Sequence, residues 1–280
     1  MGATDVAFEI DELSPADAPA GLALSDEAGW NQTLEDWHCF LERGTVFGMR
    51  DAEGRVIATA ALLPSPPVTW ISMVLVTASW RRRGLANALM TRSIETAQAR
   101  RLEAWLDATP AGAAVYRPMG FAETGLGLVR LRRTSGVGAA QRKAPEYSAS
   151  LQKLLEADGR AMGFDRSELI RSFAHRAGSS IDETDGAIAL VRAGRKARQI
   201  GPVYAQKETA GIALFERILD NEPGSLVIDL SAAHPKAREF LMSRGFIFER
   251  PFTRMRFGKG APQAAGGSVE LIAVAGPEFG

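Results

Sequence analysis

The alternation of apolar and polar residues is most informative between residues 70 and 90. Residues 71–76 are apolar apart from Ser72, and this length and β-branched content are typical of a strand buried on both faces. A short loop and three arginines follow, and from Leu85 to about Arg100 the apolar residues recur at helical spacing. This stretch therefore predicts a strand, a basic turn and the start of a helix.

The same patterns predict strands and helices along the rest of the chain. In the first half we expect the order β, α, α, β, β, β, α, β, α, β. Its strands are predicted at 6–13, 45–49, 56–63, 71–76, 103–108 and 121–132, and its helices from Pro15 and at 34–43, 85–100 and 111–120. In the second half, helices are predicted at 148–158, 165–176, 207–219 and 235–243, and strands at 187–195, 198–204, 225–230 and from 247 to near 257. The predicted fold class is therefore α/β (α+β).

The length of 280 residues suggests two domains. Residues 134–145 are small and polar, which is typical of a linker. We therefore assign a first domain to residues 1–135, a linker to 136–147 and a second domain to 148–280. The second half also repeats glycine motifs of the first: Gly211-x-Ala213 matches Gly84-x-Ala86, and Gly245-Phe246 matches Gly120-Phe121, with offsets that agree within two residues. We interpret this as a duplicated half.

The composition is that of an ordinary globular protein without net charge. Lys and Arg together number 33, as do Asp and Glu, which disfavours a general affinity for nucleic acid or membranes. Cys39 is the only cysteine, which excludes an intrachain disulfide and a cysteine cluster for a metal, and we expect no metal. The acidic N-terminal segment lacks a signal sequence, and no apolar run reaches membrane-spanning length. A cytoplasmic protein is the expectation.

The basic turn has the chemistry of an anion site. The first turn of a helix carries unpaired backbone N–H groups and the positive end of the helix dipole. A glycine at position 84 and a small residue at Ala86 let a ligand approach that backbone closely. Phosphates bind at such positions, and the arginines add charge-assisted donors. The alternative is a basic, solvated helix start.

Two motifs resemble those of the GNAT acyl-CoA N-acyltransferases. Arg81-x-x-Gly84-x-Ala86 resembles the R/Q-x-x-G-x-G/A pyrophosphate loop of that family, and Tyr116-x-x-x-Gly120-Phe121 resembles its Y-x-x-x-G-F motif. The resemblance implies two GNAT-like domains, each a mixed, mostly antiparallel sheet flanked by helices. Both halves are also similar to the tandem YitH-like branch, in GWNQT, WISMVLV and LDATPAG, and in IGPVYA, VIDL, TRMRFG and AGPEFG.

The resemblance also implies a cosubstrate, acetyl-CoA, and residues that hold it. The pantetheine would pair with strand backbone, the diphosphate would lie at the turn, and Tyr116 would protonate the departing sulfur. The cofactor-binding residues predicted in this way are Val74, Leu75, Val76, Arg81, Arg82, Arg83, Gly84, Leu85, Ala86 and Asn87. For Tyr116 the alternative is a core aromatic that packs its helix.

The second half lacks both chemical features. Glu208 replaces Arg81, which puts a negative charge where a phosphate would lie, and Leu241 occupies the tyrosine position. We therefore expect a degenerate domain that cannot bind CoA in the family's manner but shapes the acceptor site. The first half is expected to bind CoA without it.

The acceptor site and the general base are less defined. Trp30, Asn31, Gln32, Trp37 and Ser72 are candidates to contact the acceptor, although core packing is an equal alternative for Trp37.

No base can be assigned from the sequence. Ser72-Met73 stands where many relatives have a glutamate. Glu35 and His38 share a helical face near the acceptor side, but a surface pair is the preferred interpretation of these two residues. His234 fits a helix start, and Asp229 and Glu278 reach the cleft only if the second domain places them there; solvated charges are the default for both.

These inferences lead to one predicted function and two alternatives. We expect an N-acetyltransferase that moves an acetyl group directly from acetyl-CoA to a primary amine of a small molecule. The alternatives are a non-catalytic acyl-CoA sensor and a transferase for a longer acyl group. The expected partner is a small-molecule amine, with no nucleic acid and no membrane, and the oligomeric state is open, a homodimer being one option.

Overall fold

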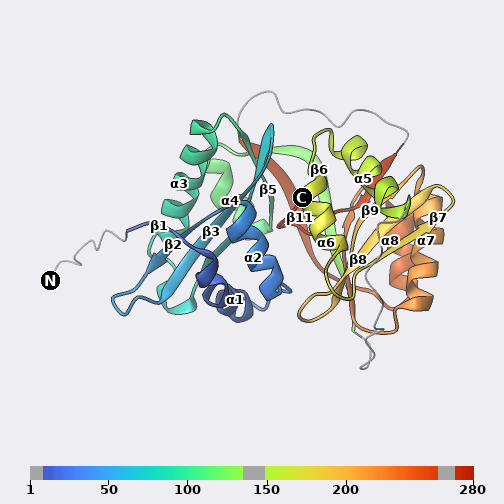
Figure 1. Ribbon diagram of the computed structural model, residues 1–280, viewed down its shortest axis with the longest axis horizontal. Helices are drawn as coiled ribbons and strands as arrows, with labels where there is room; N and C mark the ends of the chain where they lie inside the picture. Colours follow the sequence, from blue (N-terminus) through green and yellow to red (C-terminus); the bar gives the residue numbers. More distant parts are fainter. Residues whose placement is uncertain (1–8, 135–148, 258–268) are drawn as a thin grey trace.

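The computed structural model describes residues 9–134, 149–257 and 269–280, which form one mixed sheet flanked by helices (Figure 1). The order of the strands across this sheet is β1-β2-β3-β4-β5-β11-β6-β10-β12-β9-β8-β7. The strands are β1 (Asp11–Glu12), β2 (Thr45–Arg50), β3 (Val56–Ser65), β4 (Val68–Val76), β5 (Glu103–Ala108), β6 (Ala122–Arg133), β7 (Ser180–Thr184), β8 (Ala187–Arg192), β9 (Arg198–Ala205), β10 (Leu226–Ser231), β11 (Ile247–Phe257) and β12 (Glu270–Ala273). The pairings β4–β5 and β9–β10 are parallel and the other described pairings are antiparallel. The predicted fold class is confirmed.

The helices cover both faces of the sheet. They are α1 (Ala18–Glu27), α2 (Leu34–Arg43), α3 (Leu85–Ala99), α4 (Pro110–Tyr116), α5 (Ala149–Met162), α6 (Ser167–Ala174), α7 (Glu208–Asn221) and α8 (Pro235–Ser243). Short 3-10 turns occupy Pro15–Asp17, Ala78–Trp80 and Arg117–Met119. The element order predicted for the first half is therefore correct.

Local sequence explains where several of these elements begin and end. The Thr33 hydroxyl accepts a hydrogen bond from the Asp36 amide, and the Asp36 carboxylate accepts one from the Thr33 amide, which closes a capping box at the start of α2. Gly84, with φ of +83°, starts α3, and Gly120 and Gly245 have φ of +100° and +88° after α4 and α8. These two glycines occupy equivalent places in the two halves, as the repeat predicts.

The two halves exchange strands β6 and β11. β11, from the second half, lies between β5 and β6 of the first half, and β6 in turn pairs with β10 of the second half (Figure 1). Met255 on β11 is fully buried in the core that Ile71 and Leu106 form with α3 and α4. The halves therefore share one continuous sheet, which the sequence did not indicate.

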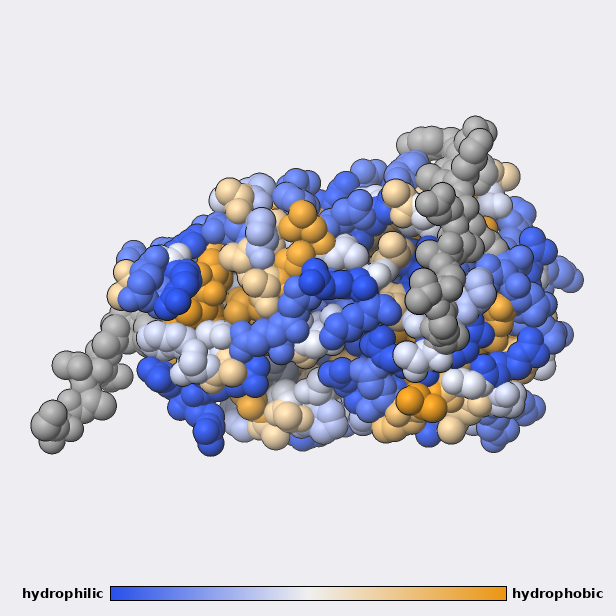
Figure 2. Space-filling model, turned by 90° about the horizontal axis from the view of Figure 1, so that it is seen from below, coloured by the Kyte–Doolittle hydropathy of each residue, from blue (hydrophilic) through white to orange (hydrophobic). Residues whose placement is uncertain are grey.

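A second core also joins the halves. It packs α1 and α2 together with α5 and α6 and includes Trp37, Phe40, Phe173 and Phe279. The face of the molecule in Figure 2 is mostly hydrophilic and carries smaller apolar areas. Within the described ranges, no helix is both long and apolar enough to cross a membrane.

Some predicted features differ from the structure or lie outside it. β7 and β12 are strands that the apolar pattern did not predict. The strand predicted at 6–13 is observed only as β1, Asp11–Glu12, although residues 9, 10 and 13 are also described. Residues 1–8 and the predicted linker 136–147 lie outside the described residues.

The strand exchange changes what we expect of the first half alone. A fragment of residues 1–135 should aggregate, because β5 and β6 would lose β11 between them and expose unpaired edges. Co-expression with residues 148–280 should give a soluble complex on size-exclusion chromatography. A monomeric fragment 1–135 that unfolds cooperatively on its own would contradict this prediction.

Candidate active site

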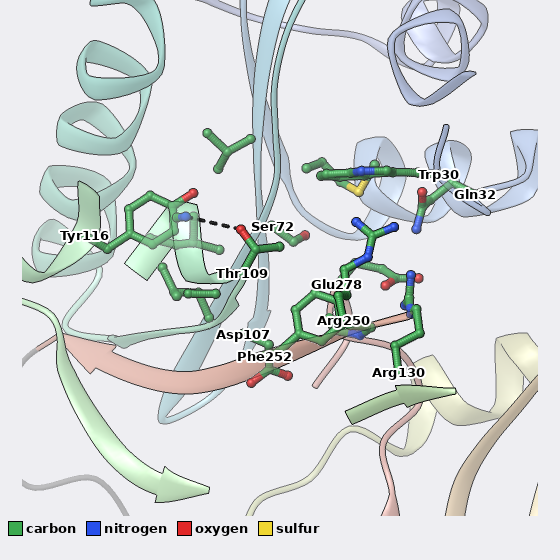
Figure 3. Close-up of a pocket in the computed structure, with 17 residues that line it drawn as sticks. Trp30, Gln32, Ser72, Asp107, Thr109, Tyr116, Arg130, Arg250, Phe252 and Glu278 are labelled. Carbon is green, nitrogen blue, oxygen red and sulfur yellow. Dashed lines mark hydrogen bonds between the residues drawn. The ribbon is translucent and has the colours of Figure 1, made fainter. Parts of the chain in front are cut away.

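The site is built around a gap between two parallel strands. The pairing of β4 with β5 ends at Trp70 and Trp105, after three residue pairs, and the strands then diverge. An open cavity of about 140 Å³ occupies the gap (Figure 3). Its walls come from both halves: Trp30, Gln32, Ile71, Ser72, Met73, Val74, Leu106, Asp107, Ala108, Thr109, Gly112, Tyr116, Arg130, Arg250, Phe252, Pro277 and Glu278.

β4 carries an irregularity where it lines the cavity. The register with β3 shifts between Thr59 and Ala61, opposite Met73, whose φ is +52°. The Thr59 hydroxyl donates a hydrogen bond of 2.9 Å to the Met73 carbonyl and so holds the bulge. A bulge of this kind redirects the main chain of a strand. Here it does so beside the cavity.

The turn at the start of α3 has the predicted geometry. Ala88 is the first residue whose amide donates within the helix, to the Gly84 carbonyl at 3.0 Å. The amides of Leu85, Ala86 and Asn87 therefore have no partner in the helix, and no side chain caps them. A Cβ at Gly84 would meet no atom within 4 Å, so the glycine is required by its positive φ and not by crowding.

The three arginines of this turn lie on the surface in different settings. Arg81 Nε donates to the Val76 carbonyl at 3.0 Å. Arg83 donates to the Ser79 carbonyl at 3.1 Å and lies 4.6 Å from the centre of the Trp80 ring. The Arg82 side chain is exposed and has φ of +62°. Two arginines thus shape the turn while all three keep it positively charged.

Tyr116 lies at the end of α4 and lines the cavity (Figure 3). Its helix is fixed by Thr109, whose hydroxyl accepts a hydrogen bond of 3.2 Å from the Gly112 amide. Burial raises the pKa of Tyr116 to about 12. The phenol is therefore protonated at neutral pH and has a proton to donate.

Three of the five candidate acceptor residues line the cavity. They are Trp30, Gln32 and Ser72. Gln32 Oε1 and Ser72 Oγ are buried, and among the described residues neither has a hydrogen-bond partner. Unpaired buried oxygens are costly unless a ligand or water completes them, so both are available to a bound donor.

The predictions for Asn31 and Trp37 need correction, because both side chains lie outside the cavity. Asn31 is buried and bonds the loop after β8, donating to the Ala197 carbonyl and accepting from the Lys196 and Ala197 amides. Trp37 is fully buried in the core and donates to Ser25 Oγ at 3.0 Å. Both residues support the fold. For Trp37 the core alternative named from the sequence is the one observed, whereas the position of Asn31 depends on a segment more than 160 residues away.

Three of the residues considered as general bases do not line the cavity. Glu35 is exposed on α2, and His38 lies 3.6 Å from Glu42 on the same helix. Neither Glu35 nor His38 is among the residues that line the cavity. His234 starts α8, as the sequence indicates, and its Nε2 contacts the Leu271 carbonyl at 3.1 Å.

Asp229 and Glu278 are not solvated charges, which corrects the default interpretation. Asp229 is fully buried and receives two hydrogen bonds from Arg130, at 2.7 and 2.9 Å. Glu278 lines the cavity with a side chain that is 11% exposed. Asp107, which also lines the cavity, is held by Arg254 through hydrogen bonds of 2.9 and 2.8 Å.

Glu278 lies in the cavity wall because several contacts hold the tail segment, Ala275–Gly280, in place. The Trp70 indole donates to the Pro277 carbonyl at 2.9 Å, and Arg166 donates to the carbonyls of Phe279 and Gly280 at 2.9 and 2.6 Å. The Phe279 ring stacks on the Phe40 ring, with 4.9 Å between the ring centres. These contacts fix the backbone on both sides of Glu278. They join residues more than one hundred positions apart, which is why the sequence pattern did not reveal them.

The second half closes its corresponding gap with its own chain. β9 and β10 pair in parallel at Arg198–Ile200 and Leu226–Ile228, and β12 then pairs with both strands. Glu208 Oε1 accepts a hydrogen bond from the Ala237 amide at 2.8 Å and is thus used at the start of α8. Leu241 is fully buried. The described part of this half therefore has neither an open gap between its parallel strands nor a free carboxylate at the start of α7.

Comparison with family models decides the family. Residues 10–121 match the model of the acetyltransferase (GNAT) family, and residues 154–268 match the model of an acetyltransferase (GNAT) domain. The chain belongs to the GNAT acetyltransferase family. It carries two GNAT domains in tandem, whereas its place in the YitH-like branch stays a prediction. No sequence among curated proteins matches it.

Solved structures share the GNAT fold over the whole chain. A Pyrococcus horikoshii protein provisionally described as an acetyltransferase has a TM-score of 0.76 at 17% identity, and covers 100% of this chain and 98% of its own. A GCN5-related N-acetyltransferase from Sphaerobacter thermophilus has a TM-score of 0.62 at 16% identity, with 94% and 99% covered. A tandem GNAT protein from the clavulanic acid biosynthesis pathway has a TM-score of 0.60 at 17% identity, with 91% and 100% covered. At these identities the likeness concerns the fold.

The buried pair beside the cavity gives a stability prediction for this GNAT protein. Asp229→Asn should lower the free energy of unfolding by about 3 kcal/mol, because it leaves the Arg130 guanidinium buried without its countercharge. Glu249→Gln is the control, since the Arg132–Glu249 pair is about one-fifth exposed and its loss should cost about 1 kcal/mol or less. Urea unfolding measures both; equal losses would contradict the assigned difference.

Proposed function

We propose that the protein transfers an acetyl group from acetyl-CoA to a primary amine of a small molecule. The observation that carries the proposal is the open β4–β5 gap, with a protonated tyrosine in its wall and an uncapped helix N-terminus shortly after β4 in the chain. A ligand with a diphosphate at one end and a thioester at the other matches these features. Membership of the GNAT family supports acyl transfer in general. The choice of acetyl-CoA as the donor and of an amine as the acceptor is what we propose.

The cosubstrate would bind through main-chain groups first. Its diphosphate would accept hydrogen bonds from the amides of Leu85, Ala86 and Asn87 at the positive end of α3, with Arg82 and Arg83 adding charge and Gly84 allowing close approach. Its pantetheine amides would pair with the backbone of Val74–Val76, on the side where β4 has no β5 partner, as an added strand would.

The reaction requires a held thioester, an oxyanion site and an acid for the sulfur. Backbone amides of β4 near Leu75 and Val76 would donate to the oxyanion of the tetrahedral intermediate. Tyr116 would donate its proton to the departing sulfur, since a phenol and a thiol have ordinary pKa values of about 10 and 8.5. Holding both reactants in the gap lowers the barrier further by about 7 kcal/mol or more.

The acceptor would enter between the α1–α2 loop and the tail segment. Gln32 Oε1 and Ser72 Oγ are the unpaired oxygens there, and an amine provides the N–H groups that would complete them. Trp30 and Phe252 supply apolar walls for the rest of the molecule. The absence of net charge gives no support for a nucleic-acid acceptor.

Release of free thiol from acetyl-CoA in the presence of amino acids, polyamines or aminoglycosides tests the proposed activity. We expect turnover with at least one amine and an N-acetyl product in the mass spectrum. Tight CoA binding without turnover would instead favour a non-catalytic acyl-CoA sensor. Turnover only with longer acyl-CoA thioesters would favour a transferase for a longer acyl group.

The diphosphate assignment predicts the effect of reversing two charges. Arg82→Glu with Arg83→Glu should weaken CoA binding about 100-fold or more, because two charge-assisted contacts become repulsive. Lys207→Glu, at the start of the equivalent helix α7, is the control and should leave the affinity unchanged. Isothermal titration calorimetry measures both. Unaltered affinity in the double variant would contradict the assignment.

The role of Tyr116 predicts a separation of turnover from binding. Tyr116→Phe should lower kcat about 100-fold or more, because the sulfur loses its proton donor, while the Kd for CoA changes little. Steady-state kinetics with calorimetry on the same preparation measures both. Wild-type kcat in this variant would remove Tyr116 as the acid.

A further inference from the structure

The Glu278 carboxylate lies in the cavity wall, and few neighbouring groups contact it closely. Its side chain is 11% exposed, and no hydrogen bond to its carboxylate occurs among the described residues. Arg192 Nη2 lies 3.7 Å from Glu278 Oε1, beyond hydrogen-bond distance. Arg192 is also divided between other partners, since it donates to the Ala275 carbonyl at 2.8 Å and lies 3.5 Å from Asp36. Glu278 therefore keeps its oxygens available to a ligand.

The other acidic group in the cavity differs on this point. Asp107 receives two hydrogen bonds from Arg254, so its oxygens are already used. Asp229, behind the cavity wall, is used in the same way by Arg130. Among the described acidic residues that line the cavity, Glu278 is the one whose carboxylate accepts no hydrogen bond from an arginine.

The position of Glu278 relative to Tyr116 suits two separate proton transfers. Figure 3 shows Tyr116 on one side of the cavity and Glu278 on the other, with Ser72 and Thr109 between them. Gln32 lies on the same side as Glu278. An acceptor amine beside Gln32 and Glu278 would thus face a thioester whose sulfur lies toward Tyr116.

We propose that Glu278, from the second half of the chain, is the general base that takes the proton from the acceptor amine. This assignment rests on the proposed acetyl transfer and completes it, since that reaction needs a base. The degenerate half would then contribute a catalytic residue as well as a wall.

The charges around Glu278 are compatible with this role. Burial raises the pKa of the Glu278 carboxyl above its ordinary value; Arg192 on β8 and Arg130 on β6 oppose the rise, whereas Asp36 on α2 and Asp229 on β10 add to it. Arg250, on β11, also lines the cavity and is paired with Glu249. A carboxyl with a raised pKa is a better proton acceptor near neutral pH than an ordinary one.

The proton balance of the step is complete. The amine binds as its ammonium ion, transfers one proton to Glu278, and its nitrogen lone pair attacks the thioester carbonyl to form the C–N bond. When the C–S bond breaks, sulfur takes the proton of Tyr116, and the second nitrogen proton returns to the tyrosinate. The products are the amide and free CoA thiol, and the proton on Glu278 leaves through the open mouth of the cavity.

Glu278→Gln tests the assignment, with the amine that gives the fastest thiol release in the screen as the acceptor. We expect kcat/KM to fall about 100-fold or more at neutral pH, with the Kd for CoA and the midpoint of thermal unfolding unchanged. In the wild type, kcat/KM should fall as the pH drops through the raised pKa of Glu278, and this acidic limb should be absent from the variant. Glu270→Gln, on β12 and half exposed, is the matched control and should behave as wild type.

The outcomes distinguish this proposal from the proposed function. Wild-type turnover that persists in Glu278→Gln, with its acidic limb, would overturn the base assignment and leave acetyl transfer intact. A variant that loses CoA affinity and thermal stability together would show a structural role and would also overturn it. Absence of turnover in the wild type with every amine would overturn both proposals.

Discussion

The geometry of the candidate site depends on the early end of the pairing between β4 and β5. Three residue pairs hold the parallel strands together, and beyond Trp70 and Trp105 they diverge. Main-chain groups that would otherwise satisfy each other across the sheet face a cavity instead. A short 3-10 turn and the Gly84 turn connect the open end of β4 to α3, so the strand backbone and the free helix amides follow one another closely in the chain.

The second half contains the same divergence of two parallel strands, but there a third strand fills the gap. β9 and β10 diverge in the same way, and β12 fills the space between them with strand backbone from the chain itself. After β12 the chain continues into the tail segment, which enters the first half's cavity. The segment that closes one gap therefore supplies Pro277 and Glu278 to the other. Together with the exchange of β6 and β11, this makes the two halves one structural unit.

Much of the fold follows from local sequence, and much of the site does not. The strand at Glu103–Ala108 and the helix at Pro235–Ser243 were predicted at their observed limits, because their apolar periodicity and capping residues are strong. The strand exchange was not predicted, since β11 has the same local pattern whichever edge it joins. The Gly84 turn was predicted. Trp30, Gln32 and Ser72 line the cavity, whereas Asn31 bonds a segment that is distant in the sequence and Trp37 packs in the core. Glu278 depends on Trp70, Arg166 and Phe40 in the same way.

A crystal structure of the full chain soaked with acetyl-CoA tests the central claim most directly. The account predicts the thioester in the β4–β5 gap, and diphosphate oxygens within hydrogen-bond distance of the amides of Leu85, Ala86 and Asn87. An unoccupied gap in a protein that binds acetyl-CoA elsewhere, or a cosubstrate bound between β9 and β10 after displacing β12, would contradict it.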